Sequence, residues 1–116
     1  MASPYIYLGG NDYLIEHDAE RPATTTGEGE AAAGLSGISG WISATDGGAA
    51  IHATLSVSLT ERSGTPGRYF GILDGADIAT RLSAYAGQFC YEVVDDGGNI
   101  ESSFPIKVLP TRQPDA

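Results

Sequence analysis

The sequence is poor in cysteine, in basic residues and in long apolar runs. Cys90 is the single cysteine among 116 residues, so no disulfide can form within the chain and a disulfide-rich secreted class is excluded. No apolar run has the length of a membrane span, and Met1 to Tyr5 lack the basic region and apolar core of a secretory signal. We therefore expect a chain that is made and kept in a reducing cytoplasm, or assembled there into something larger.

Positive charge is especially scarce. The chain has 6 Lys and Arg against 15 Asp and Glu, a formal net charge of −9, and Lys107 is its only lysine. Binding to a phosphate backbone depends on Lys and Arg displacing counterions, so this balance argues against a nucleic-acid partner. It also disfavours an anionic membrane surface. An acidic surface keeps a protein soluble and can steer it to a basic partner.

Glycine, in contrast, is abundant. The 16 glycines occur at turn-like positions without a fixed period, which excludes a collagen-like chain and a simple linker. Many glycines with few charges suit many tight turns, so the composition predicts an all-β chain. The length supports one domain, which buries roughly two-thirds of the surface of its extended chain.

The N-terminal third divides into two parts. Two aromatic-rich runs, residues 5–8 and 13–17, flank the turn at residues 9–12 and predict an N-terminal hairpin. Residues 18–34 are acidic and rich in Thr, Ala and Gly, with too little apolar surface to offset the entropy of ordering, so we expect a mobile loop or arm.

From residue 38 the pattern is that of short strands. Residues 51–60 alternate in perfect period two, the cleanest strand pattern in the chain, and Phe104, Ile106 and Val108 form a last inward stripe. Pro105 within that stripe predicts an edge strand. The other expected elements are strands at 38–44, 68–73 and 88–94 and a helix of one or two turns within 75–85, with Asp77 as its possible cap.

These elements predict about seven strands in a single antiparallel β-sandwich of the immunoglobulin kind. The expected organisation is an N-terminal hairpin and arm at 1–34, the sandwich core at 35–109 and a polar tail at 110–116.

The residues that carry chemistry predict neither an enzyme nor a cofactor or metal site. His17 and His52 lack the spacing of a zinc motif and are interpreted as surface residues. Cys90 has no cationic neighbour in sequence and is interpreted as a buried, inert thiol. The Asp and Gly residues at 95–99 match a hairpin turn rather than a calcium loop.

Aromatic residues give the better indication of a binding surface. Trp41 can be interpreted as a core residue, as an interface anchor or as a platform on which a sugar stacks. The core interpretation is favoured. Tyrosine supplies contact area at low entropic cost, and three tyrosines lie close together near the N-terminus. The predicted interface residues are Tyr5, Tyr7, Tyr13, His17, Glu28, Glu30 and Arg112.

Two runs carry a family resemblance. Residues 64–69, Gly-Thr-Pro-Gly-Arg-Tyr, and residues 85–93, Tyr-Ala-Gly-Gln-Phe-Cys-Tyr-Glu-Val, resemble the immunoglobulin-like domains of tailed-bacteriophage virion proteins. In those of the baseplate upper-protein type, a Gly-x-Tyr strand precedes Ala-Gly-x-Tyr-x-Tyr-Glu and a hairpin rich in Asp and Gly. The likeness covers about residues 50–108.

The resemblance implies a many-copy, non-enzymatic structural protein of a phage virion, assembled in the host cytoplasm at the neck, the head–tail connection, or in the tail. Its expected partners are other virion proteins and copies of itself. A capsid cement or decoration protein is one alternative. Another is an immunoglobulin-like module that binds a carbohydrate or a cell surface through Trp41 and the tyrosines.

Overall fold

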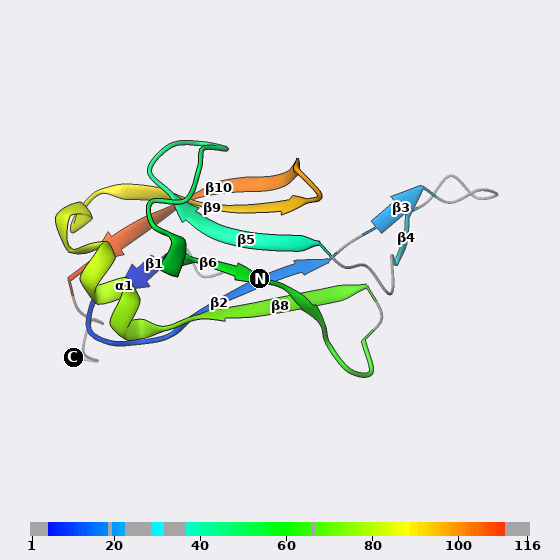
Figure 1. The fold of residues 1–116 in the computed structure, drawn as a ribbon, viewed down its shortest axis with the longest axis horizontal. Helices are drawn as coiled ribbons and strands as arrows, with labels where there is room; N and C mark the ends of the chain where they lie inside the picture. The colour runs from blue at the N-terminus through cyan, green and yellow to red at the C-terminus, as the bar shows by residue number, and fades with distance from the viewer. Residues whose placement is uncertain (1–4, 19, 23–28, 32–36, 66, 111–116) are drawn as a thin grey trace.

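The computed structural model describes residues 5–18, 20–22, 29–31, 37–65 and 67–110, and these residues are mostly β-structure (Figure 1). The strands are β1 (Tyr5–Tyr7), β2 (Tyr13–Asp18), β3 (Glu20–Pro22), β4 (Gly29–Ala31), β5 (Ile38–Ser43), β6 (Ser56–Ser58), β7 (Thr60–Glu61), β8 (Arg68–Leu73), β9 (Phe89–Asp96) and β10 (Asn99–Leu109). The helices are the 3₁₀ turns η1 (Ala53–Leu55) and η2 (Ser83–Tyr85) and the α-helix α1 (Gly75–Arg81). None of the described helices combines the length and the apolar character needed to span a membrane.

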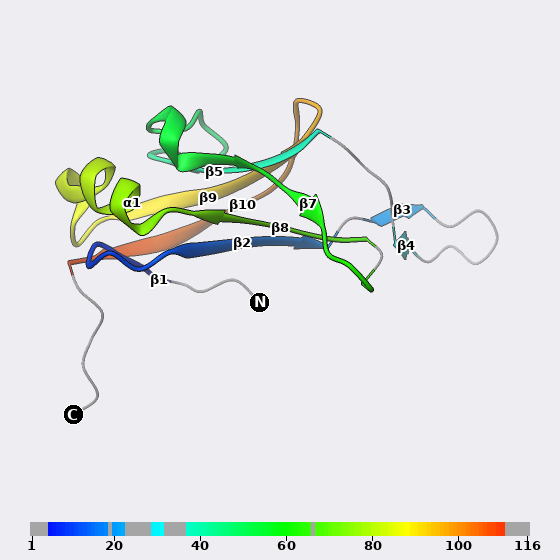
Figure 2. The same ribbon diagram turned by 60° about the horizontal axis from the view of Figure 1, so that its bottom comes forward.

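Two sheets share one hydrophobic core. The first has the order β1-β10-β9-β5-β6 and the second the order β2-β8-β7, and Figure 2 shows β2 and β8 below β5 and β9 of the first sheet. The sheets lie close together at Gly40 of β5, because a Cβ built there would lie 2.9 Å from Cγ2 of Ile15 in β2. The core is lined by Ile6, Ile38, Ile42, Cys90, Val94, Ile106 and Val108 of the first sheet and by Tyr13, Ile15, Tyr69 and Leu73 of the second. The expectation of a mostly β chain is confirmed, although the described residues form ten strands, several of only two or three residues.

The predicted N-terminal hairpin is wrong. β1 runs parallel to β10, with Tyr5 opposite Lys107, whereas β2 runs antiparallel to β8, with Tyr13 opposite Leu73. The segment at residues 8–12 therefore carries the chain from one sheet to the other rather than turning it back on itself. The turn residues correctly predicted that the strand is interrupted. Which strands pair with β1 and β2 depends on contacts with distant parts of the chain.

The alternating run at 51–60 is not one strand. His52 caps the 3₁₀ turn η1, after which β6 pairs with β5 of the first sheet and β7 pairs with β8 of the second. A single straight strand cannot pair with both sheets, so the chain changes layer at Leu59, whose amide donates to the Ile38 carbonyl. Leu55 and Leu59 still point into the core, as the period predicted.

The helix forms where expected but begins with a different cap. Asp74 is the N-cap of α1 and accepts a hydrogen bond from the Ala76 amide, while Asp77 lies in the first turn. Ile78 and Leu82 are buried against the core.

The last two strands follow the predicted pattern. Ile106 and Val108 are buried and Phe104 packs against the core. β10 lies between β9 and β1, but β1 covers only residues 107–109, so β10 is an edge on that side at Pro105. This local edge is compatible with the missing amide hydrogen of proline.

The predicted mobile segment at 18–34 contains a strand pair. β3 and β4 are antiparallel, with Arg21 opposite Glu30, and Figure 1 shows them beyond the end of the two sheets. We call residues 20–31 the arm, of which residues 20–22 and 29–31 are described. Residues 23–28, 32–36 and the tail at 111–116 lie outside the described residues.

Candidate functional site

The predicted tyrosines separate into surface and core. Tyr5 and Tyr7 lie on the outward side of β1, because Ile6 between them is buried in the core. Tyr13 is only 5% exposed and belongs to the core. The prediction that Tyr13 presents its ring at the surface is therefore wrong, because β2 turns its odd-numbered residues Tyr13 and Ile15 toward the first sheet.

Tyr5 and Tyr7 belong to a larger cluster on the outward face of the first sheet. Tyr5 lies opposite Lys107, which lies opposite Phe89 on the next strand, so the three form a row across β1, β10 and β9. The Phe89 side chain is 59% exposed and that of Tyr5 43% exposed. We call Tyr5, Tyr7, Phe89, Tyr91 and Lys107 the aromatic patch.

Lys107 supplies the charge of this patch. Its ammonium lies 5.7 Å from the centroid of the Phe89 ring, within the range of a cation–π contact. The described residues give Lys107 no ion-pair partner, whereas Arg62 and Arg68 each pair with a carboxylate. Within the described ranges the patch is thus a cation without an ion pair beside exposed rings, on a chain whose net charge is −9.

A loop lies beside the patch on the same outward face. Residues 44–50 follow β5 and fold back over the sheet: the Trp41 indole N–H donates to the Gly48 carbonyl at 2.8 Å, and the Gly47 amide donates to Ser103 Oγ at 2.9 Å. Asp46 Oδ1 accepts the Ser103 hydroxyl at 2.5 Å. We call residues 44–50 the Asp46 loop. Its anchors explain why Val93 and Ser43 are buried although they face away from the core.

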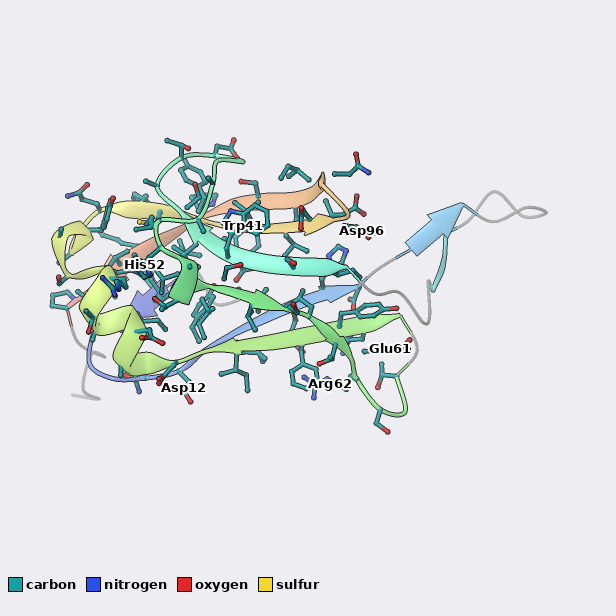
Figure 3. The ribbon with its side chains drawn as sticks, in the orientation of Figure 1. Asp12, Trp41, His52, Glu61, Arg62 and Asp96 are labelled. Atoms are coloured by element: carbon teal, nitrogen blue, oxygen red, sulfur yellow. The ribbon has the colours of Figure 1, made fainter. Side chains whose placement is uncertain are left out.

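Trp41 is neither a core residue nor an open platform. Trp41 lies on β5 (Figure 3). It is half-buried on the outward side of this strand, opposite Val93, and its indole N–H donates to the Gly48 carbonyl. The favoured core interpretation of Trp41 is therefore wrong, because its side chain fixes the Asp46 loop to the outer face of the sheet.

One functional group was missed at the sequence level: the buried carboxyl of Glu92. Glu92 is fully buried on the inward side of β9, and the Tyr13 hydroxyl donates to its Oε1 at 2.6 Å. Its Oε2 has no hydrogen-bond partner in the described part of the chain. Burial raises the pKa of Glu92 to about 7, against the opposing effect of the Tyr13 hydrogen bond. Burial and the neighbouring carboxyl also raise the pKa of Tyr13.

A signal for this group was present in the alternation of β9. If Phe89, Tyr91 and Val93 share one side, Glu92 must lie on the side of Cys90 and Val94. The acidic residue in that stripe was the sign of a buried carboxyl.

The outward face of the second sheet has its charges neutralised. Arg62 pairs with Glu16 at 3.1 Å and lies 4.6 Å from the centroid of the Phe70 ring. Arg68 pairs with Asp18 at 2.8 Å, and this hydrogen bond lowers the pKa of the Asp18 carboxyl. Exposed ion pairs of this kind contribute little to stability.

The remaining predicted residues are not brought together. His17 is half-buried in β2, opposite Tyr69 on β8, and His52 caps η1, where its Nδ1 accepts from the Thr54 amide at 3.1 Å. Glu30 lies in β4, while Glu28 and Arg112 are outside the described residues. Among the described residues, no group of three or more His, Cys, Asp or Glu is placed to hold a metal ion.

Cys90 is a buried free thiol, as predicted, and burial raises its pKa. Such a thiol is a poor nucleophile, because the thiolate is the reactive form.

Comparison with known proteins gives no relative: no family model matches the chain, and neither the curated proteins nor the solved structures contain a match.

Proposed function

We propose that this chain is a non-enzymatic, many-copy structural subunit of a tailed-bacteriophage particle, located in the virion at the neck or tail. The observation that carries the proposal is the arm, which extends from an otherwise compact pair of sheets. Its partners are copies of itself and other virion proteins, and assembly takes place in the host cytoplasm. The proposal includes no cofactor.

Among the described residues, the two strands of the arm pair only with each other and join neither larger sheet. β3 and β4 have three residues each, and an isolated two-stranded hairpin is marginally stable in water. The radius of gyration is 15.1 Å, against about 13 Å for a compact domain of this length. An extension of this kind gains stability against a neighbouring subunit, and arms exchanged between copies are a common route to symmetric assemblies.

The strand order supports an immunoglobulin-like assignment of the variable type. In that fold, strands G, F, C and C′ form one sheet and B, E and D belong to the other. Here β10-β9-β5-β6 occupy the places of the first set and β2-β8-β7 those of the second. The resemblance of residues 64–69 and 85–93 to phage virion domains maps onto the region from β8 to β9 of this arrangement.

Two measurements test the proposed role. Mass spectrometry of purified phage particles from a lysate of the gene's host should find the chain in many copies per particle. Its absence from intact particles would overturn the proposal. Replacing residues 19–36 by a short Gly-Ser linker should preserve cooperative unfolding and abolish assembly beyond small oligomers. Deletion of residues 111–116 is the control and should leave assembly unchanged. If the linker variant also assembles like the wild type, the arm has no role in assembly.

A second function, a carbohydrate-binding module, is favoured by one observation, the exposure of Tyr5 and Phe89 beside Lys107. Exposed rings stack on sugar faces, and the ammonium would favour an acidic sugar. Binding on a glycan array that Phe89→Ala abolishes would support this function, and an array without binding would exclude it for the sugars tested.

Capsid cement remains the alternative within the structural class, and the position of the chain in the particle distinguishes it.

A further inference from the structure

The geometry points to a symmetric dimer in which the Asp46 loop of each copy docks on the aromatic patch of the other, with Asp46 facing Lys107. This inference rests on the proposed structural function and names one of its partners, a second copy of the chain. Three features of the outward face of the first sheet carry it.

The first feature is the chemistry of the patch. Phe89 and Tyr5 are exposed apolar rings, and Lys107 between them has no ion-pair partner among the described residues. Interfaces are enriched in aromatic residues. An ammonium that the described part of the chain leaves without an ion pair, next to exposed rings, favours a partner that brings a carboxylate.

The second feature is the Asp46 loop, which supplies that carboxylate in a fixed position. Asp46 and Gly47 are exposed, yet both are tied to Ser103 of β10. The Gly48 amide donates to the Thr45 carbonyl at 3.0 Å and the Thr45 amide to Ser43 Oγ at 3.1 Å, which hold the loop in one shape. A loop that is ordered before binding loses less conformational entropy on docking.

The third feature is that patch and loop share one face at different heights along the strands. Lys107 and Phe89 lie opposite each other near the C-terminal end of β10. The loop is hydrogen-bonded to Ser103, four residues earlier along the same strand. A two-fold axis between them, in the plane of the interface, places each loop on the other copy's patch. The contact is then isologous, so each attraction occurs twice and the assembly closes as a dimer.

Charge reversal tests the pairing directly. Sedimentation equilibrium of the full chain should give a dimer at micromolar concentration. Lys107→Glu and Asp46→Lys should each weaken dimerisation at least tenfold, because each places two like-charge contacts in the dimer. The double variant Lys107→Glu/Asp46→Lys should bind more tightly than either single variant, since the swapped charges again attract across the axis. Its recovery is partial, because Asp46→Lys also removes the hydrogen bond from Ser103. Arg81→Glu, an equal charge change at an exposed position of α1, is the matched control.

A truncation tests the apolar part. Phe89→Ala should weaken the dimer at least tenfold. Its thermal midpoint should match that of the wild type at concentrations where both are monomeric, because the ring is exposed in the single chain. The arm variant with the Gly-Ser linker should remain dimeric.

Three outcomes would overturn the inference. A wild-type chain that stays monomeric up to millimolar concentration excludes the dimer. Failure of the double variant to recover affinity excludes the pairing of Asp46 with Lys107. Glycan or peptide binding by a monomer, lost in Phe89→Ala, assigns the patch to another partner. None of these results bears on whether the chain is found in phage particles, so the two proposals can fail separately.

Discussion

Glu92 makes the stability of this protein depend on pH in a direction opposite to that of most carboxyl groups. Its side chain is fully buried between the sheets, with one oxygen bonded to the Tyr13 hydroxyl and the other without a partner in the described residues. The protonated form is favoured in this environment, and burial raises the pKa from 4.5 to about 7. Glu92→Gln keeps the shape of this side chain and removes its titration.

The size of the pH effect on the free energy of unfolding follows from the linkage between protonation and folding. Between the unfolded and folded pKa values the folded state binds more protons, so the free energy of unfolding falls as the pH rises. The stabilisation is complete below about pH 4.5, where both states are protonated, and is lost as the pH rises through about 7. Each pKa unit corresponds to about 1.4 kcal/mol. The loss between pH 5 and pH 8 is therefore about 2.5 kcal/mol, a large share of the stability of a small domain.

The assay is urea denaturation at pH 5, 6, 7 and 8, followed by far-ultraviolet circular dichroism. The wild-type free energy of unfolding should fall by about 2.5 kcal/mol relative to that of Glu92→Gln over this range. All other groups are common to both proteins, so their contributions cancel in the comparison. Parallel curves for the two proteins would show that the pKa of Glu92 is not raised in the folded state. In Tyr13→Phe the pH-dependent loss of stability should occur at a higher pH than in the wild type. The reason is that the Tyr13 hydrogen bond lowers the pKa of Glu92, and the variant lacks this bond.

Three further predictions concern single contacts. Gly40→Ala should destabilise the fold by about 1–3 kcal/mol in urea denaturation, because the added methyl overlaps Ile15 of the facing sheet; a neutral result would mean that the sheets separate easily. Asp12→Ala should cost about 1 kcal/mol, since its carboxylate accepts the Gly75 amide at 2.8 Å at the start of α1; an unchanged melting temperature would contradict this role. Cys90 should resist a thiol reagent in the folded protein and react only on unfolding, and rapid native labelling would contradict its burial.

The sequence predicted well those features that depend on local pattern. The inward stripe of Ile106 and Val108, the buried Cys90 and the short helix near Ile78 all follow from periodicity and turn residues. Side-chain alternation is fixed by backbone geometry, so it can be counted along the chain without knowledge of neighbours.

The candidate site was predicted only in part. Tyr5 and Tyr7 were expected at a surface, and they do lie on the outward side of β1. Phe89 and Lys107 were not expected to join them, because residues 5, 107 and 89 meet only through the parallel pairing of β1 with β10 and the antiparallel pairing of β10 with β9. The sequence predicted only a turn at the Asp46 loop. The hydrogen bond between Asp46 and Ser103 could not be predicted, because it joins two distant segments.

Composition and periodicity by themselves determined that this chain is mostly β-structure, has an acidic surface and cannot form an internal disulfide, because these properties depend on residue types and local alternation. Tertiary structure alone decided which strands are neighbours, that Tyr13 and Glu92 meet in the core, and that side chains from three separate strands form the aromatic patch. The physical reason is that strand pairing is set by non-local hydrogen bonds and by burial of shared apolar surface, and many pairings are compatible with the same local pattern.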